Sequence, residues 1–253
     1  VGPGTHPWMD VPSETTAEVD MLAAARAFRP RTVGHDVYVT GFSQGASAGL
    51  GLAEELQSSH GYFRLAALAP ISGAYDFHGA EIPAMLSGQL IEKLSVAYVS
   101  YLFVAWNRLH HLYANPAEVF RKPYANRVTA LFDGNTPGDV MLASLPDTID
   151  ELLTPAGLRM LTASRGRMAD AMRVADDVCD WHPQVPMELL FSPGDGEAAN
   201  ANTTVCQADL SRQGLAVSTV DLGDDTDYNG FIHEGSEILG VAATARWFRQ
   251  LAR

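Results

Sequence analysis

One five-residue turn constrains the fold of this chain more than any other feature of its sequence. Gly41-Phe42-Ser43-Gln44-Gly45 fits the pattern Gly-x-Ser-x-Gly, with the β-type run 37–40 directly before it and a helix rich in small residues directly after it. A sharp strand-to-helix turn holds its central residue in a strained conformation with the side chain exposed. We expect Gly41 and Gly45 to be required because a side chain at either position would collide with the neighbouring strand and helix. The pattern therefore predicts a nucleophilic serine at Ser43.

The residue after the serine is predicted to bind a developing negative charge. Gln44 stands at the start of the helix, where backbone N–H groups lack partners and the helix dipole is positive. Its N–H is therefore the predicted donor to an oxyanion.

A serine hydroxyl is a weak nucleophile and needs a base that is itself held by a carboxylate. In turns of this kind the three groups follow the chain order serine, acid, histidine. Asp195 lies just beyond the predicted strand 187–191, and His233 lies just before the predicted last helix, about 234–251. We therefore predict the set Ser43, Asp195 and His233.

Other acids compete with Asp195 at this point. Glu197 is two residues further on, and four more carboxylates precede the histidine: Asp221, Asp224, Asp225 and Asp227. The cluster at 221–227 is interpreted as a solvated loop before the histidine, although a carboxylate there could orient the ring. A metal site is not expected there, because the cluster has no regular ligand spacing. No metal and no cofactor is predicted.

The remaining pattern indicates an α/β chain. A helix is expected from about Ser13 to Phe28, with Thr15 and Glu18 as a capping box. Further strands are expected at 65–69, ending at Pro70, and at 216–222. Short apolar strands separated by helices predict a parallel sheet with helices on both faces.

A long helical stretch interrupts this alternation. It is rich in large apolar residues between 94 and 113 and is broken by several prolines further on. We interpret 85–180 as an inserted helical cap, and 1–84 with 181–253 as the core. The apolar stretch 94–113 could roof a hydrophobic pocket, or it could serve only to pack the cap.

Charge and hydropathy exclude other classes of protein. The 253 residues carry 30 Asp plus Glu against 17 Lys plus Arg, a formal net charge of −13. Nucleic acid is not an expected partner, since binding it requires a basic face. The longest nearly apolar run, 96–106, is too short to span a bilayer, so no transmembrane segment is predicted.

Cys179 and Cys206 could form a disulfide or remain thiols.

Taken together, these residues resemble the α/β-hydrolase superfamily, and more narrowly its capped bacterial and fungal secretory lipases and esterases. The resemblance extends along nearly the whole chain. Its motifs are Gly4-Thr-His-Pro-Trp8, the turn at 41–45, the strand exit 68–76, and Gly194-Asp195 followed by Asn202-Thr203. Relatives carry the acid about seven residues before the Asn-Thr pair, which favours Asp195 over Glu197. The segment 196–199 departs from the pattern of the relatives.

The resemblance implies a serine esterase or lipase acting on a small hydrophobic ester through an acyl-enzyme. A peptidase or acyltransferase on the same scaffold, or a weakly active or non-catalytic hydrolase-like protein, remains an alternative. A disulfide between the cysteines would support an extracytoplasmic location.

The start of the chain departs from the fold that the resemblance implies. Strands normally precede the helix that leads into the turn, and a loop among them supplies a second oxyanion donor. The residues before Val37 hold one predicted helix and no clear strand. The N-terminal strands are therefore predicted to be missing, leaving an open sheet edge at which the chain could pair with another copy.

Overall fold

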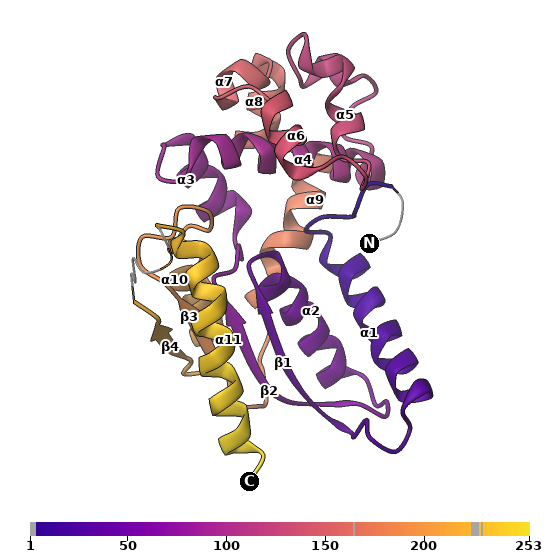
Figure 1. The fold of residues 1–253 in the computed structure, drawn as a ribbon, viewed down its shortest axis with the longest axis vertical. Coiled ribbons are helices and arrows are strands. Elements are labelled where there is room, and N and C mark those ends of the chain that lie inside the picture. Colours follow the sequence, from indigo (N-terminus) through magenta and orange to yellow (C-terminus); the bar gives the residue numbers. More distant parts are fainter. Residues whose placement is uncertain (1–3, 164, 224–227, 229) are drawn as a thin grey trace.

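The described part of the chain contains a parallel sheet whose strands follow the chain order. The computed structural model describes residues 4–163, 165–223, 228 and 230–253 (Figure 1). Its sheet has the order β1-β2-β3-β4, with β1 (Asp36–Phe42), β2 (Arg64–Ile71), β3 (Glu188–Phe191) and β4 (Ser218–Asp221). Because all strands run parallel, their carboxyl ends meet at one edge of the sheet, where the loops can bring distant residues together. The predicted parallel sheet is confirmed.

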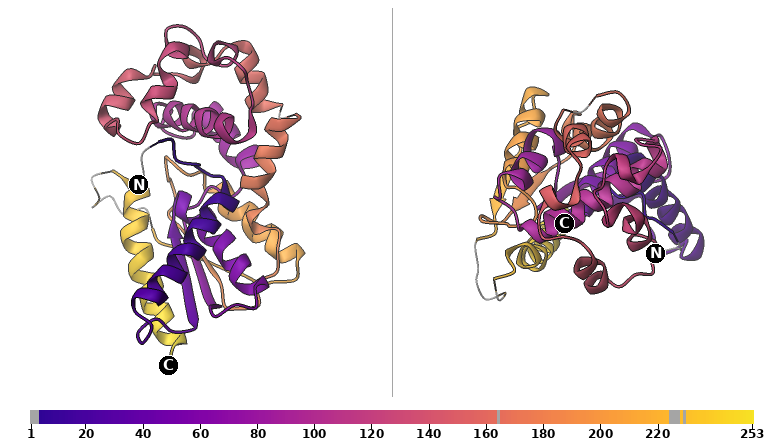
Figure 2. Two further views of the ribbon diagram at one scale, coloured as in Figure 1. Left: turned by 90° about the vertical axis from the view of Figure 1, so that its right-hand side faces the viewer. Right: turned by 90° about the horizontal axis from the view of Figure 1, so that it is seen from above.

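Helices cover both faces of this sheet. On one face, α2 (Gln44–Ser58) and α10 (Ala201–Arg212) share an apolar cluster with the strands, and α1 (Val11–Phe28) packs against α2 (Figure 2). On the other face, α11 (Ile232–Leu251) packs through Trp247 and Phe248 against Ile71 and Leu190. Burial of both faces explains why β2 and β3 are largely apolar runs that do not alternate, whereas the edge strand β4 is more polar and largely exposed.

Several element boundaries differ from the sequence prediction: β4 is shorter than 216–222, the last helix begins at Ile232, and two further differences involve prolines. The first helix begins at Val11 and not near Ser13, because Pro12 fits the first helical turn, where its missing N–H is not needed. Thr15 and Glu18 therefore lie inside α1, and the predicted capping box is wrong. Strand β2 continues through Pro70 to Ile71, since a proline removes one donor without ending the extended backbone.

The insertion between β2 and β3 is helical and lies beyond the carboxyl edge of the sheet (Figures 1 and 2). Its long helix α4 (Glu92–His110) is surrounded by short helices that share one apolar cluster with it. The others are α3 (Ile82–Leu86), α5 (Val128–Leu131), α6 (Gly138–Ser144), α7 (Ile149–Leu152), α8 (Pro155–Thr162) and α9 (Arg167–Asp176), with helical turns η1 (Phe77–Glu81), η2 (Pro116–Glu118), η3 (Tyr124–Asn126) and η4 (Asp177–Cys179). We call the part from α3 to α9 the cap, and the sheet with α1, α2, α10 and α11 the core.

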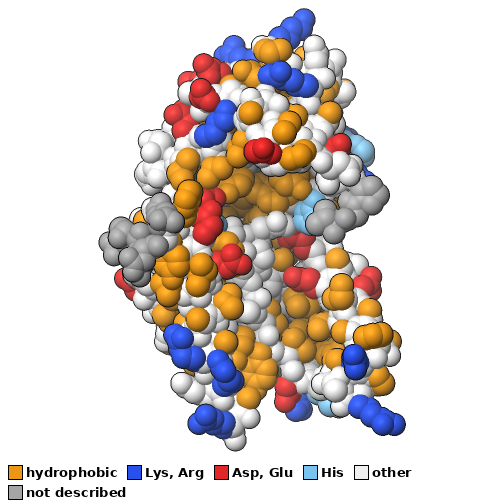
Figure 3. Space-filling view, in the orientation of Figure 1, with side chains coloured by type: hydrophobic (Ala, Val, Ile, Leu, Met, Phe, Trp, Pro, Cys, Tyr) orange, Lys and Arg blue, Asp and Glu red, His pale blue; other side chains and the backbone are white. Residues whose placement is uncertain are grey.

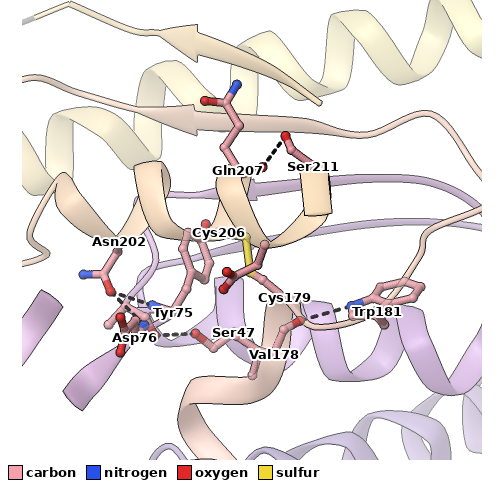
Figure 4. The surroundings of a disulfide bond; sticks show 12 residues. Ser47, Tyr75, Asp76, Val178, Cys179, Trp181, Asn202, Cys206, Gln207 and Ser211 are labelled. Atoms are coloured by element: carbon pink, nitrogen blue, oxygen red, sulfur yellow. Dashed lines mark hydrogen bonds between the residues drawn. A yellow bond between two sulfur atoms is a disulfide. The ribbon is translucent and has the colours of Figure 1, made fainter. Parts of the chain in front are cut away.

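A disulfide joins the end of the insertion to the core. Cys179 in η4 is bonded to Cys206 in α10, which resolves the choice that the sequence leaves open (Figure 4). Beside it, buried Asn202 accepts hydrogen bonds from the backbone N–H groups of Tyr75 and Asp76, both at 2.9 Å. The chain leaving β2 is thus fixed to α10.

In the described ranges, no helix combines the length and apolarity needed to cross a membrane.

Candidate active site

Ser43 lies at the carboxyl edge of the sheet, between β1 and α2. Its φ of 55° places a non-glycine residue in the left-handed region, and its N–H donates to the Ile71 carbonyl oxygen at 2.9 Å. A Cβ on Gly41 would lie 1.8 Å from the carbonyl oxygen of Gly45, so only glycine fits at position 41. The turn therefore exposes the Ser43 hydroxyl at the cost of backbone strain.

The predicted reason for the second glycine is wrong. A Cβ on Gly45 would meet no atom within 4 Å, so no collision excludes a side chain there. Gly45 instead lines the pocket beside Ser43, and a side chain would occupy space in that pocket.

Three predicted site residues come together in one hydrogen-bonded chain. His233, at the start of α11, places Nε2 2.8 Å from the Ser43 Oγ and Nδ1 2.7 Å from the Asp195 Oδ2. A carboxylate only accepts hydrogen bonds, so Nδ1 carries the proton and Nε2 is free to accept from the serine hydroxyl. The second oxygen of Asp195 accepts from the N–H groups of Glu197 and Ala198, at 2.9 and 3.1 Å. This arrangement can remove a proton from Ser43.

The competing acids lie elsewhere. Glu197 turns toward the cap, where its Oε2 accepts from the Tyr98 hydroxyl at 2.6 Å. Asp221 ends β4 and its Oδ1 accepts from the Gly223 N–H at 2.7 Å. The remaining candidates, Asp224, Asp225 and Asp227, lie outside the described residues.

Opposing effects act on the pKa of His233. Burial of the ring lowers the pKa, but the hydrogen bond and charge of Asp195, with the charges of Glu197 and Glu234, outweigh burial and raise it above its ordinary value of 6.5. The surrounding carboxylates therefore stabilise the imidazolium, which is the form that a base adopts after taking a proton.

Gln44 occupies the first position of α2, next to Ser43. Within the described residues, no carbonyl or side chain accepts a hydrogen bond from its backbone N–H. This free N–H at a helix N-terminus is available to an anionic oxygen bound at Ser43. The Gln44 side chain points elsewhere, with Nε2 donating to the buried Glu14 carboxylate at 2.5 Å.

A pocket of about 330 Å³ opens beside Ser43. Apolar side chains from four segments form most of its wall: Trp8, Met9, Phe42, Ala74, Phe77, Met85 and Ala198. Figure 3 shows hydrophobic side chains gathered in a hollow between the cap and the core. Besides Ser43 and Gln44, the polar wall residues are Glu81, Tyr98 and Glu197. Burial raises the pKa of Glu81 to about 7, although the Ala199 N–H and the Asn202 side chain donate to its Oε2.

The stretch 94–113 contributes less to this pocket than its sequence suggests. Tyr98 is the residue of this stretch that lines the pocket, whereas Phe103 and Trp106 are buried in the apolar cluster of the cap. Sequence reasoning missed Glu14 and Glu81, because a single glutamate in a helical pattern gives no signal of burial. Nor does the sequence show that Trp8 and Met9 belong to the pocket, although the motif 4–8 includes Trp8.

Three solved structures with a similar fold are described as a hydrolase, an esterase and a lipase. A protein of Legionella pneumophila described as a hydrolase matches with a TM-score of 0.87 and 20% identity over 99% of this chain and 66% of that one. The rice cell wall degrading esterase LipA of Xanthomonas oryzae matches with a TM-score of 0.81 and 24% identity over 94% and 65%. Lipase A of Candida antarctica in its closed state matches with a TM-score of 0.69 and 11% identity over 96% of this chain and 55% of that one.

The chain thus spans slightly less than two thirds of the length of the first two of these structures. No protein-family model matches it, and no curated protein matches it either. At these identities the comparison shows the fold, which is that of the α/β-hydrolases.

Proposed function

We propose that this chain, which has the α/β-hydrolase fold, hydrolyses carboxylic esters through Ser43, His233 and Asp195. The observation that carries the proposal is the hydrogen-bonded chain from Asp195 through His233 to Ser43. Its serine is held at positive φ between a strand and a helix, beside an apolar pocket. The esterase and lipase descriptions of LipA and of Candida antarctica lipase A support ester hydrolysis over other hydrolytic reactions.

In the proposed reaction, Ser43 Oγ attacks the ester carbonyl carbon while His233 Nε2 takes the hydroxyl proton. The carbonyl oxygen becomes an oxyanion and accepts from the Gln44 N–H. His233 then delivers the proton to the leaving alkoxide, which departs as an alcohol and leaves an acyl group on Ser43. A water molecule, deprotonated by His233, attacks this acyl-enzyme, and the acid leaves as Ser43 regains its proton. Asp195 orients the ring and stabilises the imidazolium in each half-reaction.

The pocket favours a small, uncharged and largely apolar acyl group. Trp8, Phe42 and Phe77 offer aromatic surface, and the volume of about 330 Å³ limits the size of the group. A carboxylate on the acyl group would lose its hydration in this pocket, and it would be repelled by Glu81 and Glu197 whenever these are ionised. We therefore expect butyrate esters to be hydrolysed faster than hemiesters of dicarboxylic acids.

A fluorophosphonate probe tests this proposal, because it forms a covalent adduct only with an activated serine. We expect an adduct on Ser43 by mass spectrometry, no adduct in Ser43→Ala, and hydrolysis of p-nitrophenyl butyrate that stops with labelling. Ser72→Ala is the matched control, since Ser72 is a buried serine directly after β2 whose hydroxyl has no hydrogen-bond partner in the part of the chain that the structure describes.

Two results would contradict the proposal. A folded protein without an adduct on Ser43 would point to a non-catalytic hydrolase-like protein. Faster cleavage of aminoacyl anilides than of p-nitrophenyl esters would favour a peptidase on the same scaffold.

A further inference from the structure

A buried glutamate connects two walls of the proposed active site. Glu14 lies in the first turn of α1, and only 7% of its surface is exposed. Its Oε1 atom accepts from the Met9 N–H at 3.0 Å and from the Gln44 side chain at 2.5 Å. Met9 and Gln44 belong to separate segments, and both line the pocket beside Ser43. One carboxylate oxygen therefore fixes two parts of the pocket wall relative to each other.

The first partner, Met9, has a strained backbone. Its φ is 58°, in the left-handed region that residues other than glycine seldom adopt, and its side chain is almost fully buried. Such a conformation persists only where neighbouring contacts hold it. The hydrogen bond from its N–H to Glu14 is one of these contacts. It keeps Met9, and with it the adjacent Trp8, in the wall of the pocket.

The second partner, Gln44, carries the proposed oxyanion donor. Its side chain is tied to Glu14, whereas its backbone N–H is free within the described part of the chain. A donor contributes to catalysis only when it is aimed at the place where charge develops. Holding the side chain of Gln44 restricts the rotation of this first residue of α2, and therefore the direction of its N–H.

We propose that Glu14 is a positioning residue for ester hydrolysis, acting through Gln44 on the oxyanion and through Met9 on the acyl pocket. The inference rests on the proposed function, because it assigns Glu14 to the same site. This positioning role requires a hydrogen-bond acceptor at Oε1, but it does not require a negative charge on Glu14. The other oxygen, Oε2, is buried and has no hydrogen-bond partner among the described residues, and burial raises the pKa of Glu14 to about 7. A neutral amide with an oxygen at the same place should therefore replace it.

Three variants test the inference. Glu14→Ala removes the acceptor, and we expect kcat for p-nitrophenyl butyrate and the rate of fluorophosphonate labelling of Ser43 to fall by about 10- to 100-fold, below the effect of losing a whole oxyanion donor. Glu14→Gln keeps the acceptor and should stay within about threefold of the unchanged protein. Glu18→Gln is the matched control: this half-buried carboxylate lies one turn along α1, forms no hydrogen bond to Met9 or Gln44 in the described structure, and should not change the rate.

The outcomes separate this inference from the function on which it rests. An unchanged protein that is folded and does not label at Ser43 would overturn both. Two other results would overturn the positioning role alone. In the first, Ser43 is labelled at the same rate in the unchanged protein and in folded Glu14→Ala. In the second, kcat falls equally in Glu14→Gln and in Glu14→Ala. If Glu14→Ala does not fold, Gln44→Ala removes the held side chain and keeps the Met9 contact. We then expect kcat to fall about tenfold with little change in KM, and an unchanged kcat would overturn the inference.

Discussion

The core and the cap place their side chains at the pocket by different means. In the core, Ser43 and His233 stand at the ends of long elements, and their positions follow from the backbone of β1, α2 and α11. In the cap, α4 has 19 residues, whereas the other described helices of the cap have four to ten. Such short helices are marginal alone and depend on their shared apolar cluster.

This difference between core and cap assigns the chemical step to the core and part of the substrate selection to the cap. The reactive atoms depend on backbone geometry, so changes in the core should act on the rate constant. The cap part of the pocket depends on side-chain packing, so changes in the cap should act first on stability and on KM. Four substitution experiments test this division.

The largest effect is expected in the core, at the acid. Asp195→Asn should lower kcat by about 10⁴-fold, because an amide in place of the carboxylate no longer selects the tautomer in which Nε2 accepts. Glu197→Gln should lower kcat less than about tenfold, since Glu197 bonds to Tyr98 and not to His233. Steady-state kinetics on p-nitrophenyl butyrate checks both. A greater loss in Glu197→Gln than in Asp195→Asn would reassign the acid.

In the cap, Trp106→Ala should reduce the free energy of unfolding by about 3 to 5 kcal/mol. Trp106 is 1% exposed, and its ring N–H donates to the Trp8 carbonyl oxygen at 2.9 Å. Urea unfolding followed by circular dichroism measures the loss. Trp247→Ala, at a half-buried tryptophan of α11, is the matched control and should cost less. A fall in kcat of the folded Trp106→Ala protein at saturating substrate would contradict the division between core and cap.

Removing the bond between the insertion and the core should have a somewhat smaller effect. The double variant Cys179→Ala, Cys206→Ala opens a covalent loop with a sequence separation of 27 residues and should lower the free energy of unfolding by about 3 kcal/mol. Urea unfolding of the unchanged protein with and without a reductant provides the comparison. Equal stability with and without the bond would show that packing alone joins the insertion to α10.

The smallest expected effect is a shift in pH dependence. Protonated His233 cannot act as a base, so kcat/KM should rise with pH, with a midpoint above 6.5 because the surrounding carboxylates raise the pKa of His233. Glu197→Gln removes one of these charges, lowers that pKa and should move the midpoint to lower pH by a fraction of a unit. Exposed Glu92→Gln on α4 is the control. A midpoint that moves to higher pH in Glu197→Gln would contradict this electrostatic account.

The sequence alone predicted the parts of the molecule that depend on local geometry. A strand, a glycine-bounded serine and a small-residue helix define the turn at 41–45, and chain order points to Asp195 and His233. The parallel sheet followed from short apolar runs separated by helices. These features depend on residues that are close in sequence or on a fixed order of elements.

The remaining features depend on contacts between distant segments. Glu14 looks like any first-turn acid of a helix, and its role emerges only when α1 packs against the turn at Gln44. Glu81 is similarly buried by Ala199 and Asn202, more than a hundred residues away. The steric reason assigned to Gly45 failed because the space beside it is part of the pocket. The hydrophobic periodicity of a sequence indicates helices and strands, but it does not indicate contacts between distant segments.

The aromatic stack behind the pocket has a practical meaning for enzyme engineering. Trp8 stacks on Tyr98 and on Tyr101, with ring centroids 5.8 and 5.3 Å apart. Tyr101 does not line the pocket, yet it supports the ring that does. A mutant library aimed at the proposed acyl pocket should therefore vary Tyr101 together with Trp8, because resizing one ring without the other leaves a void or a clash in the stack.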